Sequence, residues 1–270
     1  MNQTIRKSLF SEYKRKLWSP FLKGISKYQL VKDGDHIAVC ISGGKDSMVM
    51  AFLFKELLSH QLINFKLTYL VMDPGYQAHH RQQIIENAKN LGLELTIFDT
   101  AVFEESESHK QPCYACARKR RGHLYVKAKE LGCNKIALGH HYDDVLETIV
   151  MNMFFKGTIE TMMPYLTSKN HEGMSLIRPM TLVLEKDIVS FSKSNNLSFL
   201  KCACRYSEKT EHNQGDRLKA RQVLKMLSSI DPDIPDQLFH SLSSVNLKKV
   251  LKYKFNDEVF DFYDYIEMTS

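Results

Sequence analysis

The segment Ser42-Gly43-Gly44-Lys45-Asp46-Ser47 joins an apolar run typical of a strand to an apolar run typical of a helix. The first N–H groups of a helix favour anions, and glycine lets the backbone approach a phosphate closely. Lys45 offers a positive charge to phosphates, and Ser47 offers a hydroxyl that caps the helix or donates to an oxygen. The familiar motif G-x-x-x-x-G-K-[ST] is absent, because Val39 precedes Gly44 by five residues. The loop therefore predicts a phosphate site of another kind.

Carboxylates near this loop indicate a role for a cation. Asp46 would repel a bound phosphate unless a divalent cation lies between them, and Mg²⁺ prefers such oxygen ligands. A second acidic pair, Asp143 and Asp144, follows Leu138-Gly139-His140-His141-Tyr142. This pair has three candidate roles: holding a second metal, steering an activated oxygen, and capping the helix that follows.

Short apolar runs alternate with segments of helical spacing along the first part of the chain, which predicts a parallel sheet with helices on both faces. Strands are predicted at 36–41, 66–72, 94–98 and 135–138, and helices at 47–60, 79–91 and 115–131. Ligands of such sheets bind beyond the carboxyl ends of the strands. The Ser42 loop, Asp73-Pro74-Gly75 and Gly139-His140-His141 all follow strands, so we expect them to form one site.

The later part of the chain has a looser pattern. It predicts strands at 175–179 and 197–201, helices at 185–195 and 215–228, and an acidic, aromatic tail at 255–270 that is either docked or mobile. No repeat or low-complexity linker interrupts the sequence. We expect residues 1–270 to form one compact unit, with a basic N-terminal helix, a core at 30–200 and a C-terminal helical extension at 201–270.

The 270 residues are 43% hydrophobic and 25% charged, as in soluble globular proteins. No apolar run approaches the ~20 residues of a membrane helix. The basic N-terminus has no hydrophobic segment behind it and is not a signal peptide, so we expect a cytoplasmic protein without a membrane partner.

Basic residues are clustered. Residues 1–32 contain eight Lys or Arg against the single Glu12, and Arg118-Lys119-Arg120-Arg121 forms a second cluster. Such clusters bind nucleic-acid phosphates in a salt-dependent manner, although a solvated surface has the same composition.

The six cysteines fall into two kinds. Cys40 and Cys133 stand in or beside apolar strand runs, which predicts small buried residues. Cys113-Tyr-Ala-Cys116 has a spacing that suits zinc, iron or a redox pair, and Cys202-Ala-Cys204 is too tight for a second C-x-x-C motif. A disulfide framework is not expected in a cytoplasmic chain.

The 42–47 loop resembles the PP-loop of the N-type ATP pyrophosphatases, which cleave ATP between its α- and β-phosphates. Residues 113–122 and 141–154 resemble the matching segments of the tRNA 2-thiocytidine synthetase (TtcA) family. The likeness extends from about Lys32 through Arg178-Pro179 to Phe260-Asp-Phe262.

This resemblance implies a PP-loop α/β fold, a homodimer and a [4Fe–4S] cluster held by three cysteines, one iron remaining open to carry sulfide. ATP and Mg²⁺ would then serve to replace a cytidine C2 oxygen by sulfur in the anticodon loop of tRNA. Sulfide or a cysteine desulfurase would supply the sulfur. The cluster ligands carried over are Cys113, Cys116 and Cys204. The tight Cys202-x-Cys204 spacing departs from the family pattern, so Cys202 stays a candidate.

The same resemblance suggests roles for the remaining site residues. Residues 42–47 would bind the triphosphate, and Met72 with Asp73 would lie near adenine, beside Gly139, His140 and Asp144. Asp46, Asp143 and Arg120 are the catalytic candidates, Arg120 and Lys45 stabilising negative charge as it develops.

Three alternatives remain open at this point. The enzyme could thiolate another tRNA base, as related thiouridine synthetases do. It could be a PP-loop ligase or amidotransferase-type enzyme that does not transfer sulfur, although neither needs the cysteine set. A zinc-stabilised RNA-binding protein would not need the intact 42–47 loop with Asp143 and Asp144.

Overall fold

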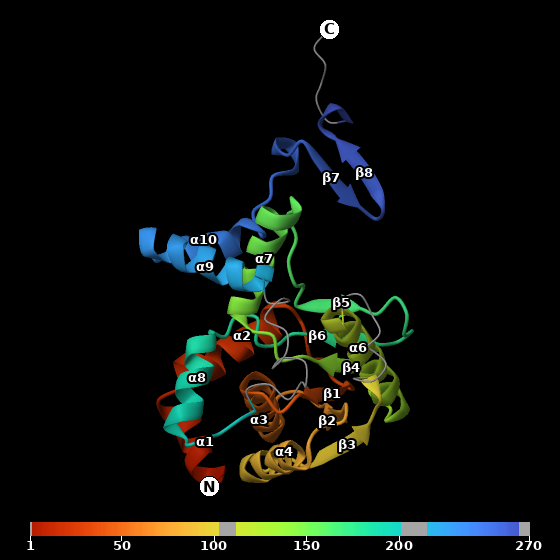
Figure 1. Cartoon of the computed structure of the whole chain (residues 1–270), viewed down its shortest axis with the longest axis vertical. Coiled ribbons are helices and arrows are strands. Elements are labelled where there is room, and N and C mark those ends of the chain that lie inside the picture. The colour runs from red at the N-terminus through yellow and green to blue at the C-terminus, as the bar shows by residue number, and fades with distance from the viewer. Residues whose placement is uncertain (1, 103–111, 201–214, 265–270) are drawn as a thin grey trace.

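A six-stranded sheet forms the centre of the molecule (Figure 1). The structure, a computed structural model, describes residues 2–102, 112–200 and 215–264. The strand order is β3-β2-β1-β4-β6-β5, and β5 alone among these strands is antiparallel to its neighbour. The strands are β1 His36–Ile41, β2 Lys66–Asp73, β3 Leu95–Asp99, β4 Lys135–Ala137, β5 Tyr165–Thr167 and β6 Ser175–Ile177. The predicted strands of the core and the predicted parallel sheet are confirmed.

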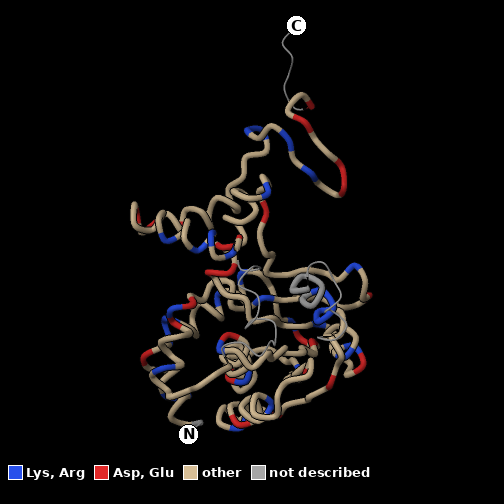
Figure 2. The backbone as a smooth tube through the Cα atoms, viewed as in Figure 1, with Lys and Arg blue, Asp and Glu red and all other residues tan. Residues whose placement is uncertain are grey.

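Helices cover both faces of this sheet, as the alternating pattern predicted. Ile37, Val39 and Ile41 of β1 pack on the side of α3, whereas Ala38 and Cys40 pack on the side of α6. Charged residues lie mainly on the helices and loops around the sheet (Figure 2). The helices are α1 Asn2–Ser11, η1 Lys14–Trp18, α2 Ser19–Lys27, α3 Lys45–Ser59, α4 Ala78–Leu91, α6 Pro112–Glu130, α7 Tyr142–Lys156, α8 Glu185–Ser194, α9 Gly215–Ile230, α10 Ile234–Ser241, η3 Leu247–Lys249 and η4 Phe262–Asp264. Within the described residues, none of them is long and apolar enough to cross a bilayer.

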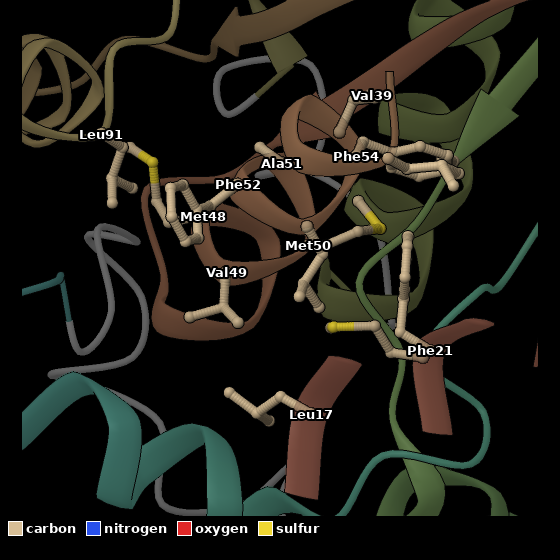
Figure 3. Packing of buried hydrophobic residues seen from close by; sticks show 14 of the residues in the cluster. Leu17, Phe21, Val39, Met48, Val49, Met50, Ala51, Phe52, Phe54 and Leu91 are labelled. Carbon is tan, nitrogen blue, oxygen red and sulfur yellow. The ribbon is translucent and has the colours of Figure 1, made fainter. Parts of the chain in front are cut away.

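Helix α3, which begins at the 42–47 loop, is the most buried helix of the core (Figure 3). Every side chain from Met48 to Phe54 is at most 1% exposed. A helix that is apolar on all sides needs partners on all sides. The sheet supplies one partner, and Leu17, Phe21 and Leu91 from other helices supply the rest. The phosphate loop therefore stands on a rigid support.

The basic N-terminal segment packs against the core instead of extending from it. Tyr13 is fully buried, and its hydroxyl lies 2.9 and 2.8 Å from the hydroxyls of Ser190 and Ser194 in α8. Arg6 forms an ion pair of 2.7 Å with the buried Glu56 of α3. The apolar side of this segment faces α3 and α8, and its basic residues lie mainly on the outside.

The strand predicted at 197–201 is wrong for its described residues, 197–200, which have no regular structure. The backbone groups of this segment bond to other partners. Leu200 N donates to Gly43 O at 3.1 Å, and Ser198 O accepts from the side chain of Asn87 at 2.8 Å. The segment is apolar because it covers the phosphate loop and α4, and not because it joins the sheet.

The predicted C-terminal helix at 215–228 is confirmed as α9, but α10 and a hairpin follow that the sequence analysis missed. Strands β7 Lys252–Phe255 and β8 Glu258–Asp261 pair antiparallel. Asn256 and Asp257 join them with φ angles of 50° and 65°, the backbone of a two-residue hairpin turn. The hairpin extends away from the sheet (Figure 1), so the first part of the predicted tail is an ordered ribbon. Residues 265–270 lie outside the described part.

A buried ion pair joins the starts of β1 and β4. Lys135 Nζ lies 2.6 Å from Asp35 Oδ2, and the two side chains are 6% and 7% exposed. The carboxylate also accepts from Lys32 N at 2.7 Å and from Asn134 Nδ2 at 2.8 Å, and Lys135 donates to Leu30 O at 3.0 Å. Since every charged atom has partners, the pair is tolerated in the interior.

We predict that Asp35→Ala lowers the free energy of unfolding by about 3–5 kcal/mol, because it leaves the Lys135 ammonium buried and unpaired. Urea unfolding at pH 7 measures this change. The matched control is Lys252→Ala, which removes an ion pair with Asp261 whose side chains are 59% and 37% exposed, with an expected cost of at most about 1 kcal/mol. Equal costs for the two variants would contradict the prediction.

Candidate active site

Hydrogen bonds of Ser42 and Ser47 hold the 42–47 loop in a closed turn. Ser42 N donates to Ser47 Oγ at 3.1 Å, and Ser47 Oγ donates to Gly44 O at 3.0 Å. Gly43 has a φ angle of 82°, and a Cβ there would meet the side chains of Ile84 and Leu200 at 2.7 to 2.9 Å. Only glycine suits that position.

A second loop lies directly against the first. A Cβ on Gly139 would come within 3.0 Å of the backbone N and Cα of Ser47, so the two backbones touch. The second loop continues into α7 through a capping box: His141 N donates to Asp144 Oδ2 at 3.0 Å, and Asp144 N donates to His141 Nδ1 at 3.4 Å. The helix-capping role considered for Asp144 is therefore present in the structure.

These loops border a cavity of about 430 Å³ at the carboxyl edge of the sheet. The cavity brings together eight of the predicted site residues: Ser42, Asp46, Ser47, Met72, Arg120, Gly139, His140 and Asp144. Its lining also includes Arg121 of the second basic cluster, and residues that the sequence analysis did not select, namely Cys40, Ile41, Leu124, Leu138, Met162 and Arg178. Gly43, Gly44, Lys45, Asp73 and Asp143 lie in the adjoining loops and are not part of this lining.

Asp46 is a partly buried carboxylate of the cavity, with a side chain that is 29% exposed. Its Oδ1 atom is buried and accepts no hydrogen bond among the described residues, its nearest basic group being His141 Nε2 at 3.8 Å, whereas Oδ2 accepts from Lys45 Nζ at 3.1 Å. Burial raises the pKa of Asp46. Such an oxygen is a suitable ligand for a cation. The described residues contain no group of three or more His, Cys, Asp or Glu able to hold a metal. A Mg²⁺ ion at Asp46 would thus need phosphate oxygens and water as further ligands, as Mg²⁺ commonly does.

Lys45 bridges two carboxylates at the edge of the cavity. Its ammonium lies 2.8 Å from Glu185 Oε1 in addition to its contact with Asp46. Partial burial lowers the pKa of Lys45, but the hydrogen bond to Glu185 and the charge of Asp46 outweigh that effect and raise it. Asp143 in turn accepts from Glu185 N at 2.7 Å and so caps the start of α8. Glu185 is a site residue that the sequence analysis missed, and only the fold brings it to Lys45.

Ion pairs join helix α9 to the site. Arg217 pairs with both Asp144 Oδ1 and Glu147, and Arg221 pairs with the other oxygen of Glu147. Glu147 is 2% exposed, so these guanidinium groups supply its charge compensation. Asp144 therefore faces the cavity while fixing the position of the C-terminal helices.

Arg178 is the buried cation of the cavity, at 6% exposed. Its Nε donates to His140 Nδ1 at 3.3 Å, and NH1 donates to Met163 O at 2.5 Å. Burial, followed by repulsion from Arg121, lowers the pKa of Arg178 to about 10. No described carboxylate forms an ion pair with Arg178, which leaves its charge available to an anion in the cavity. The Arg178-Pro179 pair was noted in the sequence only as part of a strand.

The structure gives Asp73 a local role. One carboxylate oxygen accepts from Gly75 N at 2.9 Å and from Tyr76 N at 2.7 Å, and the other accepts from Arg81 at 3.0 Å. The side chain is buried and closes the turn after β2. Met72 lines the cavity, and the placement of both residues near adenine stays a prediction.

The prediction that Cys40 and Cys133 are small buried residues is confirmed. Cys40 and Cys133 are buried and free, and burial together with Cys133 raises the pKa of Cys40 to about 12. Cys113 and Cys116 belong to the first turns of α6, the helix that carries Arg120 and Arg121 to the cavity (Figure 1). Their side chains, and the whole of Cys202 and Cys204, lie outside the described part.

Comparison with known proteins identifies the family. Residues 14–215 match the model of the PP-loop domain. A tRNA-cytidine(32) 2-sulfurtransferase of Syntrophotalea carbinolica is 33% identical over 239 residues, which cover 87% of this chain and 91% of that protein. The chain belongs to the family of the tRNA-cytidine(32) 2-sulfurtransferases, which contain the PP-loop domain. A member from Ralstonia pickettii is 33% identical over 260 residues, or 94% of this chain and 79% of its own length. The resemblance to the TtcA family inferred from the motifs is thus confirmed.

A solved structure supports the family fold. The "U34-tRNA thiolase NcsA from Methanococcus maripaludis with its [4Fe-4S] cluster" aligns with a TM-score of 0.67 at 21% identity, over 84% of this chain and 77% of that chain. At this identity the match shows a shared fold, which is the PP-loop α/β fold predicted from the sequence.

We predict that stability falls as the pH drops from 7 to 5 partly through His140. Burial, followed by the charge of Arg178, lowers the pKa of His140 to about 4 in the folded protein, whereas an unfolded histidine titrates near pH 6.5. Between these values the unfolded chain binds more protons, so this histidine contributes stability above pH 6.5 that is lost as the pH falls. The loss from pH 7 to 5 should be about 1–2 kcal/mol.

Urea unfolding at both pH values measures that loss. His140→Asn is the matched variant, because its amide oxygen can still accept from Arg178 but does not titrate. The pH dependence of the variant should be weaker than that of the wild type by the predicted amount. An unchanged dependence would show that His140 is not the titrating group.

Proposed function

We propose that the protein is an ATP-dependent, iron–sulfur tRNA thiolase that replaces the C2 oxygen of cytidine 32 in the anticodon loop by sulfur. The observation that carries this proposal is the combination, at one edge of the sheet, of a PP-loop with a buried Asp46 oxygen that accepts no hydrogen bond from a described residue, and a helix that carries both a C-x-x-C motif and cavity arginines. The names of the relatives supply the base and its position.

The first chemical step concerns ATP. Residues 42–47 present N–H groups at the start of α3, where the helix dipole favours the triphosphate. Asp46 Oδ1, which accepts no hydrogen bond from a described residue, is the protein ligand that would hold Mg²⁺, with the phosphates as further ligands. Lys45 stands beside Asp46 and can move its ammonium from Glu185 toward a phosphate. Attack of the base oxygen on the α-phosphate then forms an adenylated base and releases pyrophosphate.

The second step exchanges AMP for sulfur. When bound, a [4Fe–4S] cluster with one iron free of protein ligands supplies sulfide as the nucleophile. The AMP that leaves is an anion, and Arg120 and Arg178 line the cavity where its charge develops. His140 is neutral at pH 7 because burial, reinforced by Arg178, lowers its pKa, so it serves as a hydrogen-bonding group and not as a second cation.

Chain connectivity favours the three-cysteine set. Cys116 precedes Arg120 by one helical turn in α6, a rise of about 6 Å. Leu200 is anchored to Gly43 of the phosphate loop, and Cys204 follows Leu200 by four residues, which span at most about 14 Å when extended. The length of the chain is therefore compatible with a third ligand from the 202–204 motif. Cys202, two residues from the anchor, meets the same condition and remains the alternative third ligand.

The remaining parts of the proposal concern organisation. We expect a homodimer in the cytoplasm, with a PP-loop core at 30–200 and an extension at 201–270. Sulfide or a cysteine desulfurase is the expected sulfur donor, because an open iron accepts sulfide and needs no persulfide on a protein cysteine.

We predict that the protein converts ATP to AMP and pyrophosphate in a tRNA-dependent manner. Chromatography of products from α-labelled ATP measures this. Asp46→Asn should reduce AMP formation at least about 100-fold, because it removes the charge that holds Mg²⁺ against the phosphates. Lys66→Gln, an exposed residue at the opposite edge of the sheet, is the control. ADP as the main product would end the PP-loop mechanism.

We predict further that Cys113, Cys116 and Cys204 are each necessary for the cluster. After anaerobic reconstitution, alanine at any of them should lower iron and labile sulfide and abolish 2-thiocytidine in digested tRNA. The matched controls are Cys40→Ala and Cys133→Ala, whose buried thiols should be dispensable for the cluster.

Cys202→Ala decides the third ligand. Loss of iron in that variant with retention in Cys204→Ala would move the ligand to Cys202 and leave the chemistry intact. Four irons and full thiolation in both single variants and in the double variant would contradict the three-cysteine cluster.

A further inference from the structure

A groove separate from the ATP cavity runs between α2 and α10. It has a volume of about 370 Å³. Its walls carry Arg15, Lys23 and Lys27 on the N-terminal side and His240 on the C-terminal side. Its floor is apolar and includes Leu182, Leu184 and Phe239. A groove lined by basic residues on one side and by apolar residues beneath them suits an extended anion with hydrophobic or aromatic parts.

The basic wall is a stripe along one continuous helical segment. Helix η1 passes directly into α2, and Arg15, Ser19, Lys23 and Lys27 are spaced by four residues and all line the groove. In α2, residues four apart share a face and follow one another at a rise of about 6 Å, and Arg15 lies in the π-helical turn η1 that precedes it. The stripe therefore presents a row of positive charges and not an isolated one.

These cations have no carboxylate partner in the described part of the chain, although the Lys27 ammonium lies over the ring of Tyr28 at 5.4 Å from its centroid. Arg15, Lys23 and Lys27 are exposed, and none forms an ion pair with a described residue. By contrast, Arg6 of the same N-terminal segment is already paired with Glu56. The acidic residue in the groove, Asp236, accepts a hydrogen bond of 2.5 Å from Tyr142, which holds its carboxylate at the α7 side.

The groove and the ATP cavity share no lining residue among those described, but residues close together in the chain at the start of α7 line one and the other. Tyr142 lines the groove, and His140, two residues earlier, lines the cavity. Leu184 also lines the groove, and the next residue, Glu185, binds Lys45 of the phosphate loop. An elongated polyanion with one base in the cavity could therefore reach the groove by passing the start of α7.

We propose that the groove between α2 and α10 binds the sugar–phosphate backbone of the RNA substrate, next to the nucleotide that enters the cavity. This inference rests on the proposed function and adds to it the surface that holds the substrate. Arg15, Lys23 and Lys27 neutralise successive phosphates, and Phe239 packs against a sugar or a base. The second basic cluster, on α6, lies at the cavity itself, so the two clusters contact the RNA at different places.

The test compares two triple variants of the full-length protein that lose the same charge. Arg15→Gln/Lys23→Gln/Lys27→Gln removes the stripe. Lys66→Gln/Lys89→Gln/Lys193→Gln removes three exposed charges elsewhere. Binding of a labelled tRNA with cytidine at position 32 is measured by fluorescence anisotropy from 50 to 300 mM KCl. Thermal melts check that each variant folds.

The stripe variant should bind the tRNA about 10-fold to several hundred-fold more weakly at 0.1 M salt. The slope of log affinity against log salt should fall in magnitude by up to about 2.7, or 0.9 for each duplex phosphate no longer neutralised. The control variant should stay within about twofold of the wild type. The proposal would be overturned if the stripe variant kept the affinity and the salt slope of the wild type. It would also be overturned if the control variant lost as much affinity for tRNA as the stripe variant, because the loss would then depend on net charge alone. Binding of anionic phosphatidylserine vesicles through the stripe, without an effect on tRNA, would also overturn it.

Product analysis of the same tRNA separates this proposal from the proposed function. If the wild type binds tRNA through the stripe but forms no 2-thiocytidine, the groove stands and the thiolase assignment fails. If the wild type forms 2-thiocytidine and the stripe variant does so with the same KM for tRNA, the assignment stands and the groove proposal fails.

Discussion

The close approach of Gly139 to the backbone of Ser47 is the constraint on which the site depends. It holds the loop after β4 against the loop after β1, so that Asp46, His140 and Asp144 face one cavity. A side chain at position 139 would separate the two loops, because the atoms that it meets are backbone of a helix with no room to move. The parallel order of β1 and β4 brings the two loops to the same edge, and the glycine sets the distance between them.

The charged side chains around this contact are linked to one another by a series of hydrogen bonds and ion pairs. Asp143 caps α8, Glu185 of α8 binds Lys45, and Lys45 binds Asp46. Asp144 likewise joins the capping box of α7 to Arg217. Each carboxylate thus has a structural partner besides any ligand. Removing one of them would alter helix positions as well as chemistry. Asp46 Oδ1 differs from the other oxygens of the described site because it is buried and accepts no hydrogen bond, although His141 Nε2 lies 3.8 Å away.

The sequence predicted the core because its signals are local: continuous apolar runs mark buried parallel strands, and a glycine pair before a helix marks the phosphate loop. Glu185, Arg217 and Arg178 gave no such signal, since their partners are far away in the chain. The run at 197–200 was mistaken for a strand because an apolar segment that covers a loop has the same composition as one that joins a sheet. The hairpin was missed although Asn256-Asp257 between alternating residues is a usable turn signal.

The buried pair of Asp35 and Lys135 also bears on how the chain acquires its structure during synthesis. The two residues are 100 positions apart, and a ribosome that adds about 5–20 residues per second needs about 5–20 s to pass from one to the other. During that time β1 can pair with β2, but its other edge has no partner until β4 is made. The central strand of the nascent protein thus exposes an open edge, a state in which strands tend to associate between chains. The slow, non-local closure of β1 by β4 is where we expect aggregation to compete with folding.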